Sequence, residues 1–348
     1  MLVAAGEPQG QLMALHLRGL NDGPLQFDLK DLVRKVAGAS RKALKVEWRW
    51  GFIDTLLWPG LNGFEAIEGP YVELTRLLRT KAELVPAMPW HREITATDRL
   101  RAHRLLSRVR TLHVGPWEMR QRYDELWSLI AREGLPPSVK ELVLTDVPDK
   151  RSNDHQITWI ELGDLSQANA ALRQLERISL RGSFLRLGDV DLPRLKELSI
   201  FSSTFSDVGP LRSARWPSLE KLSVGFGDDT YNPEPATVED LKALIREVPE
   251  KVTHLGLRNL PFTDELIATL ATSAVLRRLT QLDLSFGVLL EGGAQLLEQH
   301  AAAFAHLELL DVTDTGITRF DELKPRIPGL HRGPEWRTKV DRYVSVSE

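Results

Sequence analysis

The sequence predicts an α/β fold, a solenoid with a parallel β-sheet on its concave face and helices or irregular returns on its convex face. Three observations support this prediction. A six-residue phrase recurs along the chain, each copy carries aliphatic residues at its first, fourth and sixth positions, and segments with helical apolar spacing lie between several copies. One such strand cannot bury its own apolar side chains, so neighbouring copies must stack to form a shared core.

The repeated phrase occurs eight times between residues 109 and 312. The copies read VRTLHV, VKELVL, LERISL, LKELSI, LEKLSV, VTHLGL, LTQLDL and LELLDV, and they begin at Val109, Val139, Leu175, Leu195, Leu219, Val252, Leu279 and Leu307. Neighbouring copies start 20 to 36 residues apart, which overlaps the roughly 20–29-residue period of leucine-rich repeats. Because side chains alternate between the faces of a strand, the fourth and sixth residues are the expected core.

The segments between the copies predict the opposite wall. Residues 236–248 place five aliphatic residues on one helical face, and residues 263–276 and 291–304 have similar patterns. On the first two segments the expected buried residues are Val238, Leu241, Leu244, Ile245 and Val248, followed by Leu266, Ile267, Leu270 and Leu276. The repeats that begin at Leu175 and Leu195 are too short for full helices, so we expect extended or 3₁₀ returns there.

The chain is expected to have three parts. Residues 1–105 form an N-terminal capping region with helices and a WRWGF strand segment, residues 106–330 form the solenoid, and residues 331–348 form a C-terminal tail or cap. A solenoid needs caps because its terminal repeats would otherwise expose the core. The strand-like segment 46–58 is expected to close the first repeat. The polar tail contains YVSV, which is compatible with an added edge strand and equally with a loose end.

The phase and spacing of the phrases resemble bacterial leucine-rich-repeat proteins. Residues 255–297, LGLRNLPFTDELIATLATSAVLRRLTQLDLSFGVLLEGGAQLL, are similar to one bacterial subfamily of these repeats. Near the start, GEPQGQLMALHLR resembles the end of a repeat-companion domain that precedes bacterial leucine-rich-repeat arrays, and WRWGF resembles the phrase that follows it. The resemblance implies a horseshoe-shaped protein-interaction scaffold, and it carries over no catalytic residue.

The concave face is the predicted binding surface. The third and fifth residues of each phrase, and the residue after the sixth, should point to this face. The candidate binding residues are Arg177, Ser179, Arg181, Ser199, Phe201, Lys221, Ser223, His254, Arg258 and Asp283. Four small residues, Ser179, Ser199, Ser223 and Gly256, should form a low floor between cations, with Phe201 and Phe226 nearby. This pattern favours a peptide or an acidic loop as ligand, although small residues can also simply relieve crowding on a curved sheet.

Composition excludes several other classes. The chain has no cysteine, which removes disulfides, thiol nucleophiles and thiolate zinc sites and fits a reducing compartment. The net charge of -3 argues against nucleic acid as a partner. The Arg-rich segment 92–110 fits contact with nucleic acid or an acidic partner, but it also reads as the solvated face of an amphipathic helix, which the acidic balance favours. No stretch is long and apolar enough to predict a membrane span.

Neither a metal site nor a cofactor is expected. Asp283, Asp311 and Asp314 could supply oxygen ligands to calcium, but DVTDTG lacks the spacing of an EF-hand loop. No phosphate-binding loop, dinucleotide fingerprint or nucleophile elbow is present in the sequence.

The leading functional prediction is therefore a non-catalytic, cytoplasmic bacterial scaffold that binds a protein or peptide. Two alternatives remain open. One is an enzyme whose acid/base residues lie in the 60–104 insertion, with Glu65, Glu68, Glu73 and His91 as candidates. The other is a structural module that forms homo-oligomers through the tail or an edge strand.

Overall fold

The computed structural model describes residues 45–49, 52–58, 68–69, 71–72, 75, 108–115, 121–145, 157–227 and 234–333. The chain divides into two compact units. The first comprises Met1–Gln121, Glu125–Asn153 and Ala170–Leu175, and the second comprises Arg122–Asp124, Asp154–Asn169 and Glu176–Glu348. The boundaries that we expect at residues 105 and 330 stay a prediction.

The described part of the first unit contains four of the strands. Strands β1 (Lys45–Arg49) and β2 (Phe52–Trp58) pair antiparallel, and β2 then pairs parallel with β3 (Thr111–Val114), which pairs parallel with β5 (Glu141–Leu144). The segment 46–58 therefore forms strands beside the first repeat phrase, as the sequence predicts. Helix α5 (Asp124–Glu133) buries Leu126, Trp127, Leu129 and Ile130 along one face.

The second unit contains most of the repeat strands. These are β7 (Arg177–Arg181), β9 (Glu197–Phe201), β10 (Lys221–Gly225), β11 (His254–Arg258), β12 (Gln281–Asp283), β13 (Leu309–Asp311) and β14 (Leu330–His331). They pair in this order, and every pairing is parallel. Beside them, β6 (Ile160–Asp164) pairs parallel with β8 (Ser183–Arg186). The fold is thus mixed α/β with a mostly parallel sheet, an arrangement compatible with a solenoid.

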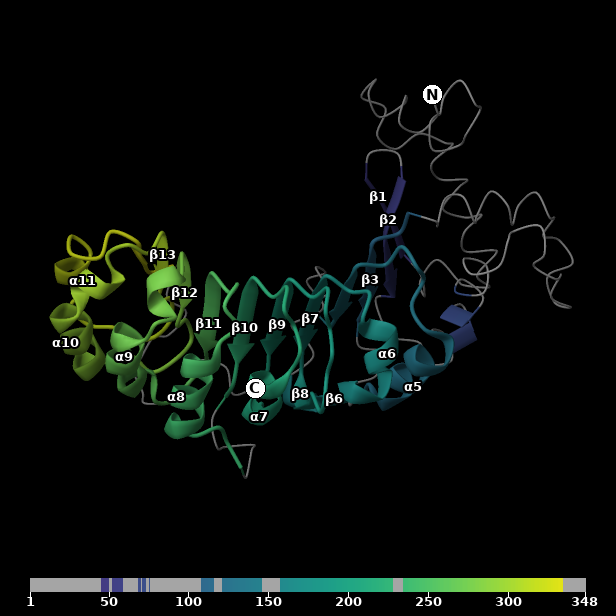
Figure 1. Cartoon of the computed structure of the whole chain (residues 1–348), viewed down its shortest axis with the longest axis horizontal. Coiled ribbons are helices and arrows are strands. Elements are labelled where there is room, and N and C mark those ends of the chain that lie inside the picture. Colours follow the sequence, from purple (N-terminus) through teal and green to yellow (C-terminus); the bar gives the residue numbers. More distant parts are fainter. Residues whose placement is uncertain are drawn as a thin grey trace, which may run out of the picture. The chain divides into compact units, whose positions relative to one another are not determined.

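Helices return the chain between these strands. They are α7 (Val208–Ser213), α8 (Val238–Glu247), α9 (Thr263–Thr272), α10 (Glu291–Gln299) and α11 (Ala301–Phe304), followed by α12 (Phe320–Leu323). In Figure 1, α7 to α10 lie on the same side of the strands β9 to β13. We call the opposite side of these strands the open face.

The predicted helices at 236–248, 263–276 and 291–304 are confirmed, with ends that differ by a few residues. The return after Leu175 is extended, as expected, and contains β8. The return after Leu195 was expected to be extended or 3₁₀, but it contains the short α-helix α7. Six residues suffice there because Val208 and Leu211, three positions apart, both reach the core, and Pro210 lies in the first turn, where its missing N–H costs nothing.

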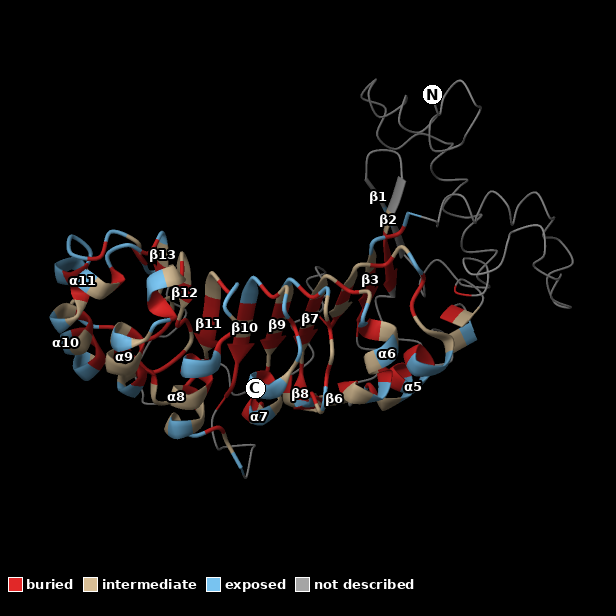
Figure 2. Cartoon of the chain, in the orientation of Figure 1, coloured by how far each residue is buried: buried red, intermediate tan, exposed pale blue. Residues whose placement is uncertain are grey.

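The core consists of the aliphatic positions of the repeat. The fourth and sixth residues of all eight phrases are buried, namely Leu112, Val114, Leu142, Leu144, Ile178, Leu180, Leu198, Ile200, Leu222, Val224, Leu255, Leu257, Leu282, Leu284, Leu310 and Val312. The first residue of every phrase is buried as well. Figure 2 shows this burial as red segments along the strands. Because paired strands align these positions, each core residue of β7, β9 and β10 lies beside its equivalent in the next repeat.

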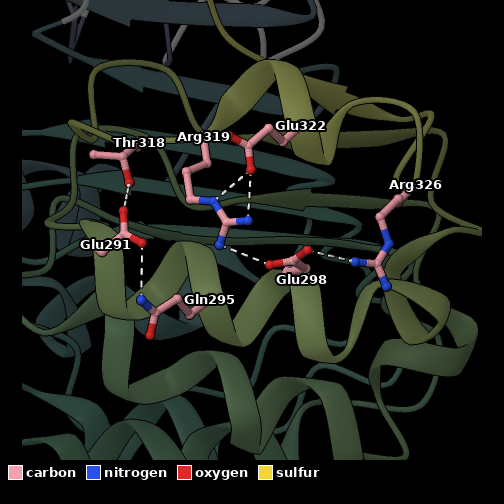
Figure 3. Close-up of polar contacts among 7 residues, drawn as sticks. All are labelled: Glu291, Gln295, Glu298, Thr318, Arg319, Glu322 and Arg326. Atoms are coloured by element: carbon pink, nitrogen blue, oxygen red, sulfur yellow. Dashed lines mark hydrogen bonds and ion pairs between the residues drawn. The ribbon is translucent and has the colours of Figure 1, made fainter.

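A polar network joins α10 to the segment that follows β13 (Figure 3). Glu291 accepts hydrogen bonds from Thr318 Oγ1 at 2.6 Å and from Gln295 Nε2 at 3.0 Å. Arg319 has a left-handed backbone with φ of 58°, and this turn directs its guanidinium toward two carboxylates. It pairs with Glu298 at 2.8 Å and with Glu322 at 2.7 Å, and Arg326 approaches Glu298 at 3.0 Å. The network ties the last helices of the described chain together.

Candidate binding surface on the open face

All ten predicted binding residues lie on five neighbouring strands of the second unit. Arg177, Ser179 and Arg181 are on β7, Ser199 and Phe201 on β9, Lys221 and Ser223 on β10, His254 and Arg258 on β11, and Asp283 on β12. They occupy alternate positions to the buried core residues, so their side chains share the open face. Nine are neither fully buried nor fully exposed, and Lys221 is exposed.

The expected floor of small residues forms one row across four strands. Ser179 pairs with Ser199, Ser199 with Ser223, and Ser223 with Gly256, so the predicted register is confirmed. The row is tightly spaced at its end, because a β-carbon on Gly256 would lie 2.6 Å from Ser223 Oγ. A larger residue at Gly256 would force the Ser223 side chain to move.

One rim of the floor carries alternating charges. Lys221 Nζ lies 3.3 Å from Glu197 Oε1, and both side chains are at least 40% exposed, so this ion pair contributes little to stability. His254 follows in the same row. Its pKa lies below the ordinary value, mainly because of desolvation and also because of the nearby Lys221. The imidazole is therefore neutral at neutral pH, and its Nδ1 lies 2.9 Å from Thr253 Oγ1.

The opposite rim is built around Arg258. Its Nε donates to Ser285 Oγ at 3.1 Å and lies 3.1 Å from Asp283 Oδ2. The guanidinium carbon lies 4.8 Å from the ring centroid of Phe201 and 5.1 Å from that of Phe286. The two rings meet edge to face, with centroids 5.9 Å apart. We call Phe201, Arg258, Asp283, Ser285 and Phe286 the arginine cluster.

The position of Phe201 depends on a neighbouring glycine. Gly225 pairs with Phe201 in register, and a β-carbon on Gly225 would lie 2.7 Å from the Phe201 ring. Because Gly225 has no side chain, the ring can lie close to β10 and reach Arg258 on β11. Arg181, on the other side of Phe201, lies 5.9 Å from the same ring centroid. One aromatic ring thus lies near two guanidinium groups, in the manner of a cation–π contact.

Asp283 holds a charge at an energetic cost. Desolvation raises its pKa above the ordinary value, and the neighbouring Asp311, its partner in register, adds to this shift. Arg258 acts in the other direction, and so do hydrogen bonds from Ser285, whose N–H donates to Asp283 Oδ1 at 2.9 Å. Arg258 and Ser285 therefore stabilise the charged form of this carboxylate against the desolvation.

The structure corrects one expectation and adds one residue. Phe226 was expected near the floor, but it is buried in the core and lies 5.8 Å from the Phe205 ring. Phe286, at the equivalent position of a later repeat, takes its place. Its backbone is left-handed, with φ of 64°, and its ring centroid lies 5.1 Å from the guanidinium carbon of Arg258. Asn259 and Asp314 are left-handed at the same position of the neighbouring repeats, and Asn and Asp favour this conformation, so these two residues, rather than the apolar spacing, were the available signal.

The residues of the enzyme alternative fall largely elsewhere. Glu65, Glu73 and His91 lie outside the described residues, and Glu68 pairs with Arg132 at 3.0 Å. Most of the Arg-rich segment 92–110 also lies outside them. Within the described part of the chain, no three His, Asp or Glu side chains, including Asp283, Asp311 and Asp314, are grouped so as to hold a metal ion. No described helix has the length and apolar character of a membrane span.

Comparison with known proteins supports the fold alone. No protein-family model matches the chain, and no curated protein matches it significantly. Among solved structures, the chain is similar to a Bacteroides fragilis protein from a structural genomics consortium, with a TM-score of 0.61 and 20% identity over 82% of this chain and 76% of that one. An internalin from Listeria monocytogenes aligns over 89% of this chain and 95% of its own, with 13% identity and a TM-score of 0.34. The second similarity is too weak to support an argument about fold or function.

Proposed function

We propose that the chain is a bacterial leucine-rich-repeat solenoid, a horseshoe whose concave side is the open face. It acts in the cytoplasm as a non-catalytic scaffold that binds a protein or peptide by surface complementarity, without turnover. The in-register parallel strands and the buried aliphatic positions support the repeat assignment. The absence of cysteine fits a reducing compartment.

One observation carries the binding proposal. The floor of Ser179, Ser199, Ser223 and Gly256 lies between two rims of charged and aromatic side chains. Strands of a sheet lie about 4.8 Å apart, so a ligand across four of them would cover roughly 15 Å. That length accommodates a short extended peptide segment. Small floor residues let the backbone of such a segment approach closely, and the rims supply directional contacts.

The charges of the face favour an acidic ligand. Arg177, Arg181, Lys221 and Arg258 are distributed over β7, β10 and β11, whereas Glu197 is the acidic residue among the open-face positions of β7 to β11. Cations arranged on one surface steer an acidic partner toward it and stabilise it once bound. The partner is therefore expected to be an acidic peptide segment, either free or as a loop of another protein.

The test replaces small floor residues by large side chains and leaves the core residues unchanged. Ser199→Arg and Ser223→Arg should leave the melting temperature nearly unchanged, as surface substitutions usually do. They should abolish binding of the full chain to an array of random acetylated, amidated nonapeptides. Lys242→Glu on α8 is the control, because Lys242 pairs with Glu239 on the helical side and should not affect the array pattern.

Two results would contradict the proposal. If the floor variants bind the array as the wild type does while Lys242→Glu does not, the working surface is the helical side. If light scattering shows a mass that rises with concentration, and the wild type binds no peptide on the array, the homo-oligomer alternative is favoured instead.

A further inference from the structure

The guanidinium of Arg258 is only partly used by the protein. Both of its polar contacts, to Asp283 and to Ser285, involve Nε. Within the described part of the chain, neither Nη group forms a hydrogen bond. The side chain retains 22% of its accessibility. A charged group is therefore held on the open face by its Nε. Its two Nη groups, which form the fork of the guanidinium, make no hydrogen bond to the described residues.

The surroundings hold this fork in a defined orientation. Phe201 and Phe286 lie within about 5 Å of the guanidinium carbon, and the Nε contacts fix the side chain along its length. A freely rotating arginine would lose conformational freedom on binding, whereas this one has already lost it. The strand neighbour of Arg258 in register is Gly225, and Gly256 lies two residues before it. The Phe201 ring occupies the space over Gly225, and Ser223 Oγ lies close to Gly256, so the ring, rather than a side chain of β10, lies beside Arg258.

We propose that Arg258 is the anchor that binds a carboxylate of the ligand, through a bidentate contact with its two Nη groups. This inference rests on the proposed function and specifies the group that is recognised. The fork of a guanidinium matches the two oxygens of a carboxylate, and such paired, charge-assisted hydrogen bonds are stronger than neutral ones. The carboxylate belongs to an Asp or Glu side chain of the peptide, or to its C-terminus, since both present the same chemistry.

Charge selects a carboxylate over a phosphate. Asp283 already lies against Nε, and Asp311 neighbours it in register. A monoanionic carboxylate meets limited repulsion from these groups. A phosphate carries close to two charges and would meet about twice as much. Because of Asp283 and Asp311, the site should bind a carboxylate in preference to a more highly charged anion such as a phosphate.

The experiment uses the full chain and matched peptides. Each nonapeptide of the array is made with Glu and with Gln at its centre, all acetylated and amidated, and the Gln version is also made with a free C-terminal carboxylate. The wild type should prefer Glu over Gln roughly tenfold, because a hydrogen bond to a charged group is stronger than one to a neutral group by about a factor of ten in affinity. A preference for the free C-terminus instead would identify the chain end as the source of the carboxylate.

Three variants test the anchor. Arg258→Gln should remove the preference, and Arg258→Lys, which keeps the charge without the fork, should reduce it. Asp283→Asn should increase the preference, because it removes the competing carboxylate and its repulsion. This opposite direction separates recognition from a merely structural role. Arg246→Gln on α8, an exposed arginine of the helical side, is the matched control and should behave as the wild type.

The outcomes distinguish this inference from the proposed function. A Glu preference that persists in Arg258→Gln, or that is absent from the wild type, overturns the carboxylate anchor. If Ser223→Arg still abolishes all binding in that case, the open face remains the binding surface. If no peptide binds the wild type, both proposals fail. Since the Glu and Gln comparison is made on the wild type, the test stands even if Arg258→Gln does not fold.

Discussion

Leu198→Asp is the sharpest test of the strand register. Leu198 is 3% exposed and lies in register between Ile178 and Leu222, both of which are buried. Removing a buried leucine costs about 2–5 kcal/mol. An unpaired carboxylate in its place adds several kcal/mol. The sum approaches the roughly 5–15 kcal/mol that separates folded from unfolded states in typical domains, so the variant should be largely unfolded around β7, β9 and β10.

The neighbouring residue provides the control. Glu197 points to the open face, and Glu197→Ala removes only an exposed ion pair with Lys221, worth about 0–1 kcal/mol. Thermal melts followed by circular dichroism should therefore separate the two variants clearly. Hydrogen exchange should show that the lost protection centres on the strands beside β9, since stability in a repeat array is a sum of nearest-neighbour terms. Identical melts for Leu198→Asp and Glu197→Ala would refute the assigned phase.

Three further predictions concern stability. The raised pKa of Asp283 means that its contribution to stability is complete below its ordinary pKa of about 3.9 and is lost as the pH rises through the higher folded value. Urea denaturation between about pH 4 and pH 7 should therefore show a smaller fall in unfolding free energy for Asp283→Asn than for the wild type. An equal fall in the two proteins would contradict the shift. Gly225→Ala should cost about 1–3 kcal/mol by displacing the Phe201 ring from Arg258, and an unchanged denaturation midpoint would exclude that contact. Arg319→Ala should raise hydrogen exchange in α10 and α12 and leave β7 unaffected, whereas a uniform rise would argue against local coupling.

The repeat core was predictable because one physical rule determines it. Side chains alternate between the two faces of a strand, which determines the residues that face the core. Because equivalent strands stack side by side, the same positions face the core in each copy. The register of Ser179, Ser199, Ser223 and Gly256 followed from the same rule and is confirmed. Helices were predictable where the segment between copies had room for at least two turns of apolar spacing.

Features that depend on single backbone angles were not predictable. Phe226 and Phe286 lie seven residues after the first residue of their phrases, Leu219 and Leu279, yet one ring is in the core and the other lies beside Arg258. Phe286 has a left-handed backbone, as do Asn259 and Asp314 at the same position of the neighbouring repeats, whereas Phe226 does not. The small sheet that contains β6 and β8 was missed for a related reason, since these two strands carry no copy of the repeated phrase.

Stability alone does not explain the arginine cluster. Replacing a half-buried ion pair by apolar residues of similar volume is often neutral or stabilising, because desolvation of the charges offsets their attraction. Here the raised pKa of Asp283 reports that cost directly, and two phenylalanine rings are held at the surface of the sheet beside it. A fold that needed only a packed sheet would be served by a row of small or aliphatic residues, as at Ser179, Ser199 and Ser223. The cost is offset if the cluster orients Arg258 for a ligand, since an arginine fixed in advance pays less entropy on binding. The ring contacts of Phe201 and Phe286 would then favour the complex, whereas Asp283 competes with the ligand for the guanidinium.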